Sequence, residues 1–132
     1  MQPVSPTVPI FSIGDITKNL GKFTSAILAQ PQLTHGKYVL AYVEIMPIAK
    51  ILETWSEATK KPALYVQVSS LENFDNVWPK WGHELGIMMQ FWEEYGENSW
   101  SAEEVLTSED LGVKGPLVGI KETFENTDWS FV

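Results

Sequence analysis

Apolar residues between positions 78 and 96 recur with a helical period and cover more of the helix than one core-facing side requires. Pro79 suits the first turn of a helix, because a backbone N–H at that position has no partner within the helix. Gly96 suits the left-handed position that follows the last residue of a helix. The pattern therefore predicts a helix over residues 79–95. A helix this apolar is enclosed on two sides, one by the body of the domain and the other by a second subunit, a missing domain or a ligand cavity. Of these alternatives, we interpret the second side as the wall of a small-molecule pocket. The residues predicted to line that pocket are Trp78, Trp81, Met88, Phe91, Trp92 and Tyr95, together with Tyr38 from an earlier strand.

The first half of the chain alternates between helical and strand patterns. Asp15 is a good N-cap for an amphipathic helix that ends before Pro31. Alternating β-branched and aromatic residues predict a strand over residues 37–44. A helix follows, with Pro47 near its start, and a second short strand is predicted over residues 64–68. A strand, a crossover helix and a strand within this length indicate a parallel βαβ unit.

Three shorter helices are predicted after the second strand. The first has a capping box in Ser69 and Glu72, the second begins at Ser101, and the third is led by Pro116. These elements predict an α/β fold, a small helix-rich domain with a short parallel βαβ unit and a long Trp- and Met-rich helix. We expect one domain over residues 1–132.

Composition and charge narrow the classes of partner. The chain has 9 Lys and Arg residues against 17 Asp and Glu, a net charge of −8, no Cys and 2 His. This balance disfavours nucleic acid and anionic membranes as partners. Thiol chemistry is excluded, no metal motif is present, and we expect no metal and no cofactor. No signal peptide or membrane span is predicted, so the cytoplasm is the expected location.

Three side chains are candidates for acid–base chemistry. Glu84 falls within the apolar arc of the long helix, where burial would raise its pKa and suit it to proton transfer. The alternative is a partly solvated carboxylate favoured by the helix dipole. His83 is either a proton shuttle or a surface residue. Tyr42 alternates with Tyr38 and Glu44 along the first predicted strand, facing either a cavity or a covering helix.

Several segments together resemble fungal NmrA-like proteins, and the likeness runs over nearly the whole chain. They comprise residues 11–15, 26–31, 36–40, 51–57 and 89–94. NmrA-like proteins are atypical relatives of the short-chain dehydrogenases, and the resemblance implies their C-terminal, substrate-side portion. Their glycine-rich turn, which holds a dinucleotide pyrophosphate at a helix N-terminus, is absent here because no G-x-G-x-x-G occurs. The resemblance therefore transfers no catalytic residue to this chain.

The residues and the resemblance together predict a cofactor-independent isomerase or cyclase. Its substrate would be a small aromatic or polyketide-like metabolite of fungal secondary metabolism, with Glu84, His83 and Tyr42 as the acid–base groups. Two alternatives stay open. One is a non-catalytic regulatory module that binds a metabolite or a protein, and the other is a fragment of an NAD(P)-dependent reductase. Strand edges and apolar helix faces favour a homodimer.

Overall fold

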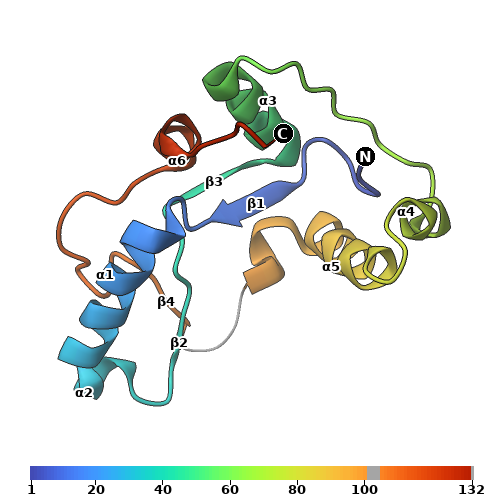
Figure 1. Ribbon diagram of the computed structural model, residues 1–132. Helices are drawn as coiled ribbons and strands as arrows, with labels where there is room; N and C mark the ends of the chain where they lie inside the picture. The colour runs from blue at the N-terminus through green and yellow to red at the C-terminus, as the bar shows by residue number, and fades with distance from the viewer. Residues whose placement is uncertain (101–104, 132) are drawn as a thin grey trace. The chain divides into compact units, whose positions relative to one another are not determined.

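The chain forms two compact units in the computed structural model, which describes residues 1–100 and 105–131 (Figure 1). Unit 1 comprises Met1–Ile10 and Met46–Ser99, and unit 2 comprises Phe11–Ile45 and Trp100–Val132. The division falls within strands β1 (Pro9–Ser12) and β3 (Glu44–Pro47), which form a two-stranded sheet.

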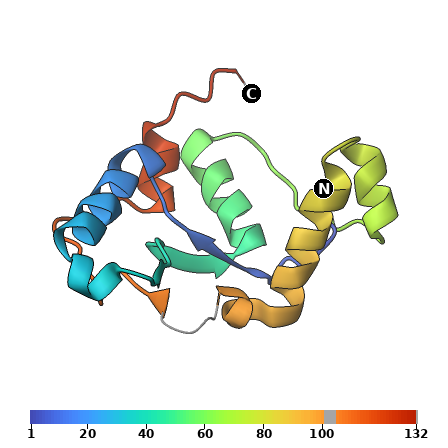
Figure 2. The same ribbon diagram turned by 90° about the horizontal axis from the view of Figure 1, so that it is seen from below.

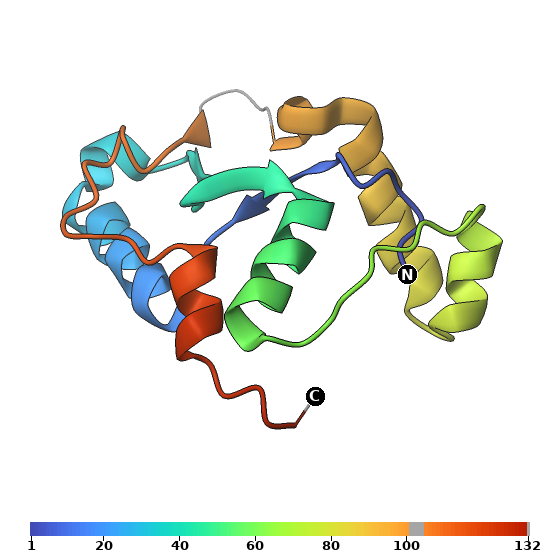
Figure 3. The same ribbon diagram turned by 90° about the horizontal axis from the view of Figure 1, so that it is seen from above.

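Unit 1 is built mainly from helices. It contains α3 (Ile48–Thr59), α4 (Leu71–Val77) and α5 (Gly82–Tyr95), and the single-turn helix η1 (Gly96–Trp100) follows α5. Helices α4 and α5 lie side by side, as Figure 3 shows from above. Phe74 of α4 is buried at this contact, and the segment before β1 is held to the unit by the Tyr65 hydroxyl, which donates to the Val4 carbonyl at 2.9 Å.

Unit 2 places a long helix over a small core. Its helices are α1 (Ile16–Ala29), the short α2 (Pro31–Thr34) and α6 (Ile120–Asn126). Strands β2 (Tyr38–Val39) and β4 (Val105–Leu106) pair in parallel, with Tyr38 opposite Val105. Figure 2 shows the chain turning from α1 through α2 toward β2. The buried core of this unit is formed by Phe23, Leu106 and Leu111.

A buried amide ties the start of α1 to the distant segment before α6. The Asn19 side chain is fully buried, and its Nδ2 donates to the carbonyls of Ile13 and Val118, each at 2.7 Å. Its Oδ1 accepts the Val118 N–H at 3.0 Å. Every polar atom of this side chain is thereby satisfied, which removes the cost of burying an amide.

Two helices and the fold class follow the sequence prediction. Asp15 caps α1, and its carboxylate accepts the N–H groups of Thr17 and Lys18. Helix α3 begins directly after Pro47 and ends at Lys60, which adopts the left-handed conformation with φ of 60°. The predicted α/β class, helix-rich with a short parallel sheet, is confirmed.

The strand predictions need correction. The segment 37–44 is not one strand, because Tyr38 and Val39 pair with β4 while Glu44 begins β3 beside β1. In the described ranges, residues 64–68 contribute only an isolated bridge between Gln67 and Gln2. The parallel pair thus joins β2 to β4 rather than residues 37–44 to residues 64–68. Pairing depends on distant partners, which local alternation does not reveal.

Helix starts also differ from the prediction. The long helix begins at Gly82 instead of residue 79, because Lys80 has a positive φ of 83° and the chain turns there. Ser70 rather than Ser69 caps α4, accepting the Asn73 N–H at 3.1 Å. The last helix begins at Ile120, several residues after Pro116. The helix predicted to begin at Ser101 lies outside the described residues.

Candidate functional site

Helix α5 and the turn before it carry a dense set of exposed apolar side chains. Their exposed fractions run from 38% at Leu85 to 64% at Trp81. We call this set the α5 aromatic surface, and it comprises Trp78, Trp81, Leu85, Ile87, Met88, Phe91 and Tyr95. The rings of Phe91 and Tyr95, one turn apart, stack with centroids 4.6 Å from each other. Five of the predicted substrate-binding residues therefore share one surface, and the sixth residue of this region, Trp92, is half-buried.

Glycine, not tryptophan, forms the packed side of α5. Gly82 and Gly86, one turn apart, are buried against α4. A Cβ at Gly82 would lie 2.6 Å from the Asp75 Cα, and a Cβ at Gly86 would lie 2.1 Å from a methyl group of Leu71. Only glycine permits this close approach. Since the glycine side faces α4, the large apolar residues remain exposed.

The two acid–base candidates of α5 lie on its exposed first turns. The Glu84 and His83 side chains are both exposed, and the His83 backbone N–H donates to Asp75 Oδ1 at 3.2 Å. Glu84 belongs to the first turn, where a carboxylate interacts favourably with the helix dipole. These positions place both groups beside the α5 aromatic surface. Their catalytic role stays a prediction.

The two tyrosine candidates belong to unit 2. Tyr38 is 74% exposed in β2, whereas the Tyr42 ring packs edge-on against Phe11 with centroids 5.2 Å apart. Glu44, predicted on the same strand face, accepts the Ile120 N–H at the start of α6. No single strand presents these three side chains, because Tyr38 lies in β2 and Glu44 in β3.

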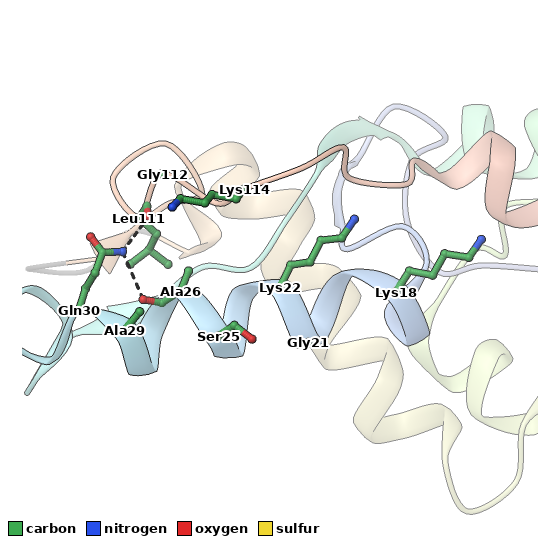
Figure 4. Close-up of a pocket in the computed structure, with 10 residues that line it drawn as sticks. All are labelled: Lys18, Gly21, Lys22, Ser25, Ala26, Ala29, Gln30, Leu111, Gly112 and Lys114. Atoms are coloured by element: carbon green, nitrogen blue, oxygen red, sulfur yellow. Dashed lines mark hydrogen bonds between the residues drawn. The ribbon is translucent and has the colours of Figure 1, made fainter.

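A cavity of about 840 Å³ lies in unit 2, between the middle of α1 and the segment around Leu111 (Figure 4). We call it the α1 cavity. Gln30 helps to hold its two sides together, because its Nε2 donates to the Leu111 carbonyl at 2.8 Å and to the Ala26 carbonyl at 3.2 Å. The lining residues are Lys18, Gly21, Lys22, Ser25, Ala26, Ala29, Gln30, Leu111, Gly112 and Lys114.

A smaller cavity of about 340 Å³ lies in unit 1, beside α3. Its lining includes the carboxylates of Glu53 and Glu57 and the phenol of Tyr65. Burial and, secondarily, the charge of Glu93 raise the pKa of the Tyr65 phenol. Neither this cavity nor the α1 cavity is lined by a residue that the sequence singled out, so the interpretation of the long helix as a pocket wall stays a prediction.

The α1 cavity is the feature that sequence reasoning missed. Lys18 and Lys22 are four residues apart and therefore share a helix face. This spacing was a signal in the sequence from which part of the cavity lining could have been predicted. Lys114 is far away in sequence, and nothing local indicates that it joins them. Sequence inspection sees no basic cluster because only the fold brings these three lysines to one cavity.

The turn after β1 does not suit a dinucleotide pyrophosphate. In a dinucleotide-binding βαβ unit, the N–H groups at the helix N-terminus after the first strand are left to the phosphates. Here the backbone N–H groups of Thr17 and Lys18 donate to the Asp15 carboxylate. The backbone of Val118 is also close, because a Cβ at Gly14 would lie 2.0 Å from the Val118 carbonyl oxygen. A negative side chain and a close backbone neighbour therefore stand where a pyrophosphate would have to bind.

Across residues 1–100 and 105–131, no three His, Asp or Glu side chains are grouped to hold a metal ion. None of the helices there has the length and hydropathy needed to span a bilayer.

The fold and these surfaces define a small, helix-rich α/β domain with an exposed aromatic helix and a lysine-lined cavity. The sequence model of the NmrA-like family matches residues 1–114 of the 132 residues, and the chain belongs to this family. The resemblance seen in the sequence is thereby confirmed, and the chain is a relative of redox and regulatory proteins. No curated protein and no solved structure matches it.

Proposed function

We propose that this chain is a non-catalytic regulatory module that binds a protein through the α5 aromatic surface, with a second copy of the chain as its partner. The observation that carries the proposal is the exposure of seven large apolar side chains on and just before one helix. Exposed apolar patches of this density mark sites of protein association. The residue types fit as well, because Trp, Tyr, Phe and Met are enriched in interface cores.

The geometry favours a protein partner over a small molecule. Small-molecule sites are concave and enclose most of their ligand, whereas side chains such as Ile87 and Phe91 are about half exposed on a convex helix. Binding a second convex apolar surface would remove these side chains from water. This removal stabilises a complex by about 25 cal/mol for each Å² of apolar surface buried. A homodimer also follows from the apolar helix face noted in the sequence.

The proposal is tested by sedimentation of the intact chain and of two matched variants. Trp81→Gln combined with Phe91→Gln removes two rings from the centre of the α5 aromatic surface and is expected to give a monomer with unchanged circular dichroism. Leu64→Gln changes an equally apolar residue, 80% exposed in unit 1 but outside this surface, and is expected to keep the dimer. A monomeric wild-type chain, or a double variant that dimerises as the wild type does, contradicts the proposal.

A second candidate function is the cofactor-independent isomerase or cyclase, acting in the cytoplasm on a small aromatic or polyketide-like metabolite of fungal secondary metabolism. It is supported by the proximity of Glu84 and His83 to Trp81 and Met88 at the start of α5. Glu84 would transfer the proton, His83 would exchange it with solvent, and Tyr42 would be a further acid–base group.

Mass analysis separates the two candidate functions. The intact chain is incubated with a metabolite extract, and the bound fraction is compared with the starting material. An enzyme returns a chemically altered compound, and Glu84→Gln and His83→Ala then each reduce turnover by about a hundredfold or more. If both variants turn over the compound at the wild-type rate, the residue assignment is wrong.

A further inference from the structure

The charge of the α1 cavity is opposite to that of the protein. Acidic residues outnumber basic ones by 17 to 9, and all nine basic residues are lysines. The lining of this cavity nevertheless includes three lysines and no carboxylate. Such a reversal of local charge attracts anions and focuses the field inside the cavity.

The three ammonium groups differ in how they are held. Lys18 is paired with Asp15 at 3.1 Å, so part of its charge is compensated. Lys22 donates to the neutral Pro116 carbonyl and keeps its charge. Lys114 makes no hydrogen bond or ion pair with any described residue. Figure 4 shows Lys18 and Lys22 projecting from α1 on the side where the Leu111–Lys114 segment runs. Lys22 and Lys114 therefore line one cavity without a carboxylate partner, and Figure 4 shows the Lys114 ammonium pointing toward Gly112 and the Lys22 ammonium pointing away from it.

The two acidic residues that precede Leu111 in the chain lie outside the cavity lining. Asp110, just before the lining residue Leu111, accepts the Thr107 N–H at 2.7 Å and the Thr107 hydroxyl at 2.9 Å. These hydrogen bonds, the backbone one first, lower the pKa of Asp110. Glu109 is exposed and is not part of the lining. Neither carboxylate neutralises Lys22 or Lys114 by direct pairing.

The remaining lining determines the chemical class of ligand. Ser25 and Gln30 supply polar groups, while Ala26, Ala29 and Leu111 supply an apolar floor. The volume of about 840 Å³ lies within the range of small-molecule sites. A lysine ammonium binds phosphate as a point charge. A phosphate monoester also carries nearly two negative charges at neutral pH.

We infer that the α1 cavity binds a small organic phosphate ester, with the phosphate held by Lys114 and attracted also by the charge of Lys22, and with the uncharged part lying against Ala26, Ala29 and Leu111. This site belongs to unit 2 and is independent of the function proposed for the α5 aromatic surface.

The inference is tested with the intact, ¹⁵N-labelled chain by following amide chemical shifts during titration with phenyl phosphate. Saturable shifts are expected at residues 18–30 and 111–114. Inorganic phosphate is expected to bind at the same residues but more weakly, because it lacks the apolar part. Sodium benzoate and sodium chloride at matched ionic strength are the controls for the carboxylate group and for screening.

Two variants separate specific binding from loss of folding. Lys114→Ala removes an ammonium without described contacts and is expected to weaken phenyl phosphate binding about fivefold, the upper range for one exposed charge pair. Ser25→Glu adds a carboxylate to the lining on a helix that accepts Glu at least as well as Ser, and is expected to weaken binding more than Lys114→Ala does. Lys121→Ala, which changes a 70% exposed lysine of α6, is the matched control and keeps wild-type affinity.

Several results would overturn the inference. Shifts that do not saturate, or that sodium chloride reproduces, show only a screening effect. Equal affinity for benzoate and phenyl phosphate shows that the site does not select phosphate. Wild-type affinity in both Lys114→Ala and Ser25→Glu places the binding elsewhere, and unchanged melting temperatures of these variants confirm that they are folded.

Discussion

Several carboxylates in this chain accept backbone N–H groups, and Asp15 shows the consequence for pH dependence. Its carboxylate accepts the Thr17 hydroxyl at 2.6 Å and two backbone N–H groups at the start of α1. These hydrogen bonds, that of the Thr17 side chain first, lower the pKa of Asp15. The ionised form is therefore favoured by folding.

A lowered pKa in the folded state contributes stability above the unfolded value of about 3.9, and this contribution is lost as pH falls through the folded value. Asp15→Asn keeps a capping oxygen but cannot titrate. We expect the difference in melting temperature between wild type and Asp15→Asn to shrink between about pH 5 and pH 3. Circular dichroism melts across this range measure it, and a constant difference would rule out this role of Asp15.

The buried Asn19 side chain links two distant segments of unit 2. Asp at this position places an oxygen, instead of the donating NH₂ group, against the Ile13 and Val118 carbonyls. We expect Asn19→Asp to lower the free energy of unfolding by about 3 kcal/mol or more at pH 7. Burial and the two neighbouring carbonyl oxygens disfavour the ionised carboxylate of the variant. The loss in free energy of unfolding is therefore smaller near pH 4, where this carboxyl group becomes protonated.

Urea unfolding at both pH values tests this prediction. The control is Asn73→Asp, which makes the same change at an exposed residue whose side chain donates a hydrogen bond to the Ser69 hydroxyl. Equal losses in the two variants would show that the buried amide network contributes nothing specific.

At the level of elements, the packing of α4 against α5 depends on glycine. Gly82→Ala brings a methyl group against the backbone of Asp75, which cannot move aside. We expect a net loss of about 1–3 kcal/mol, although alanine is the better helix former. Gly86→Ala is expected to cost less, since its closest neighbour is the end of the Leu71 side chain.

Gly21→Ala in α1 is the matched control for these two variants. No atom lies within 4 Å of a Cβ at Gly21, so alanine there is expected to stabilise the chain by about 0.5–1 kcal/mol. Denaturant unfolding of the three variants gives the comparison. A stabilising Gly82→Ala would mean that the helices separate without cost.

The sequence predicted the positions of the helices more accurately than those of the strands. Caps such as Asp15 and the left-handed end at Lys60 are local, and periodicity over α1 or α3 is sufficient to place each helix. Strands β2 and β4 contain two residues each, and their pairing joins Val39 to Leu106, about half the chain length away in sequence. Runs this short carry no local signal that distinguishes them from loop.

For the molecule as a whole, family membership raises the question of a nicotinamide cofactor. The chain lacks G-x-G-x-x-G, and Asp15 takes the N–H groups that a pyrophosphate would need. We therefore expect no saturable quenching of tryptophan fluorescence on titration with NADPH. The six tryptophans of the chain make the measurement sensitive. Saturable quenching that is retained in Lys114→Ala would revive the reductase alternative.

The sequence by itself determined the helices, the α/β class, the acidic balance and the family, because capping, periodicity and composition are local or summed properties. The tertiary structure decided which side of α5 is packed. Tryptophans outweigh glycines in any hydrophobic pattern, yet the contact with α4 uses Gly82 and Gly86 because only they allow the helices to approach so closely. It also decided that Lys18, Lys22 and Lys114 share a cavity, since folding brings together charges that lie far apart along the chain.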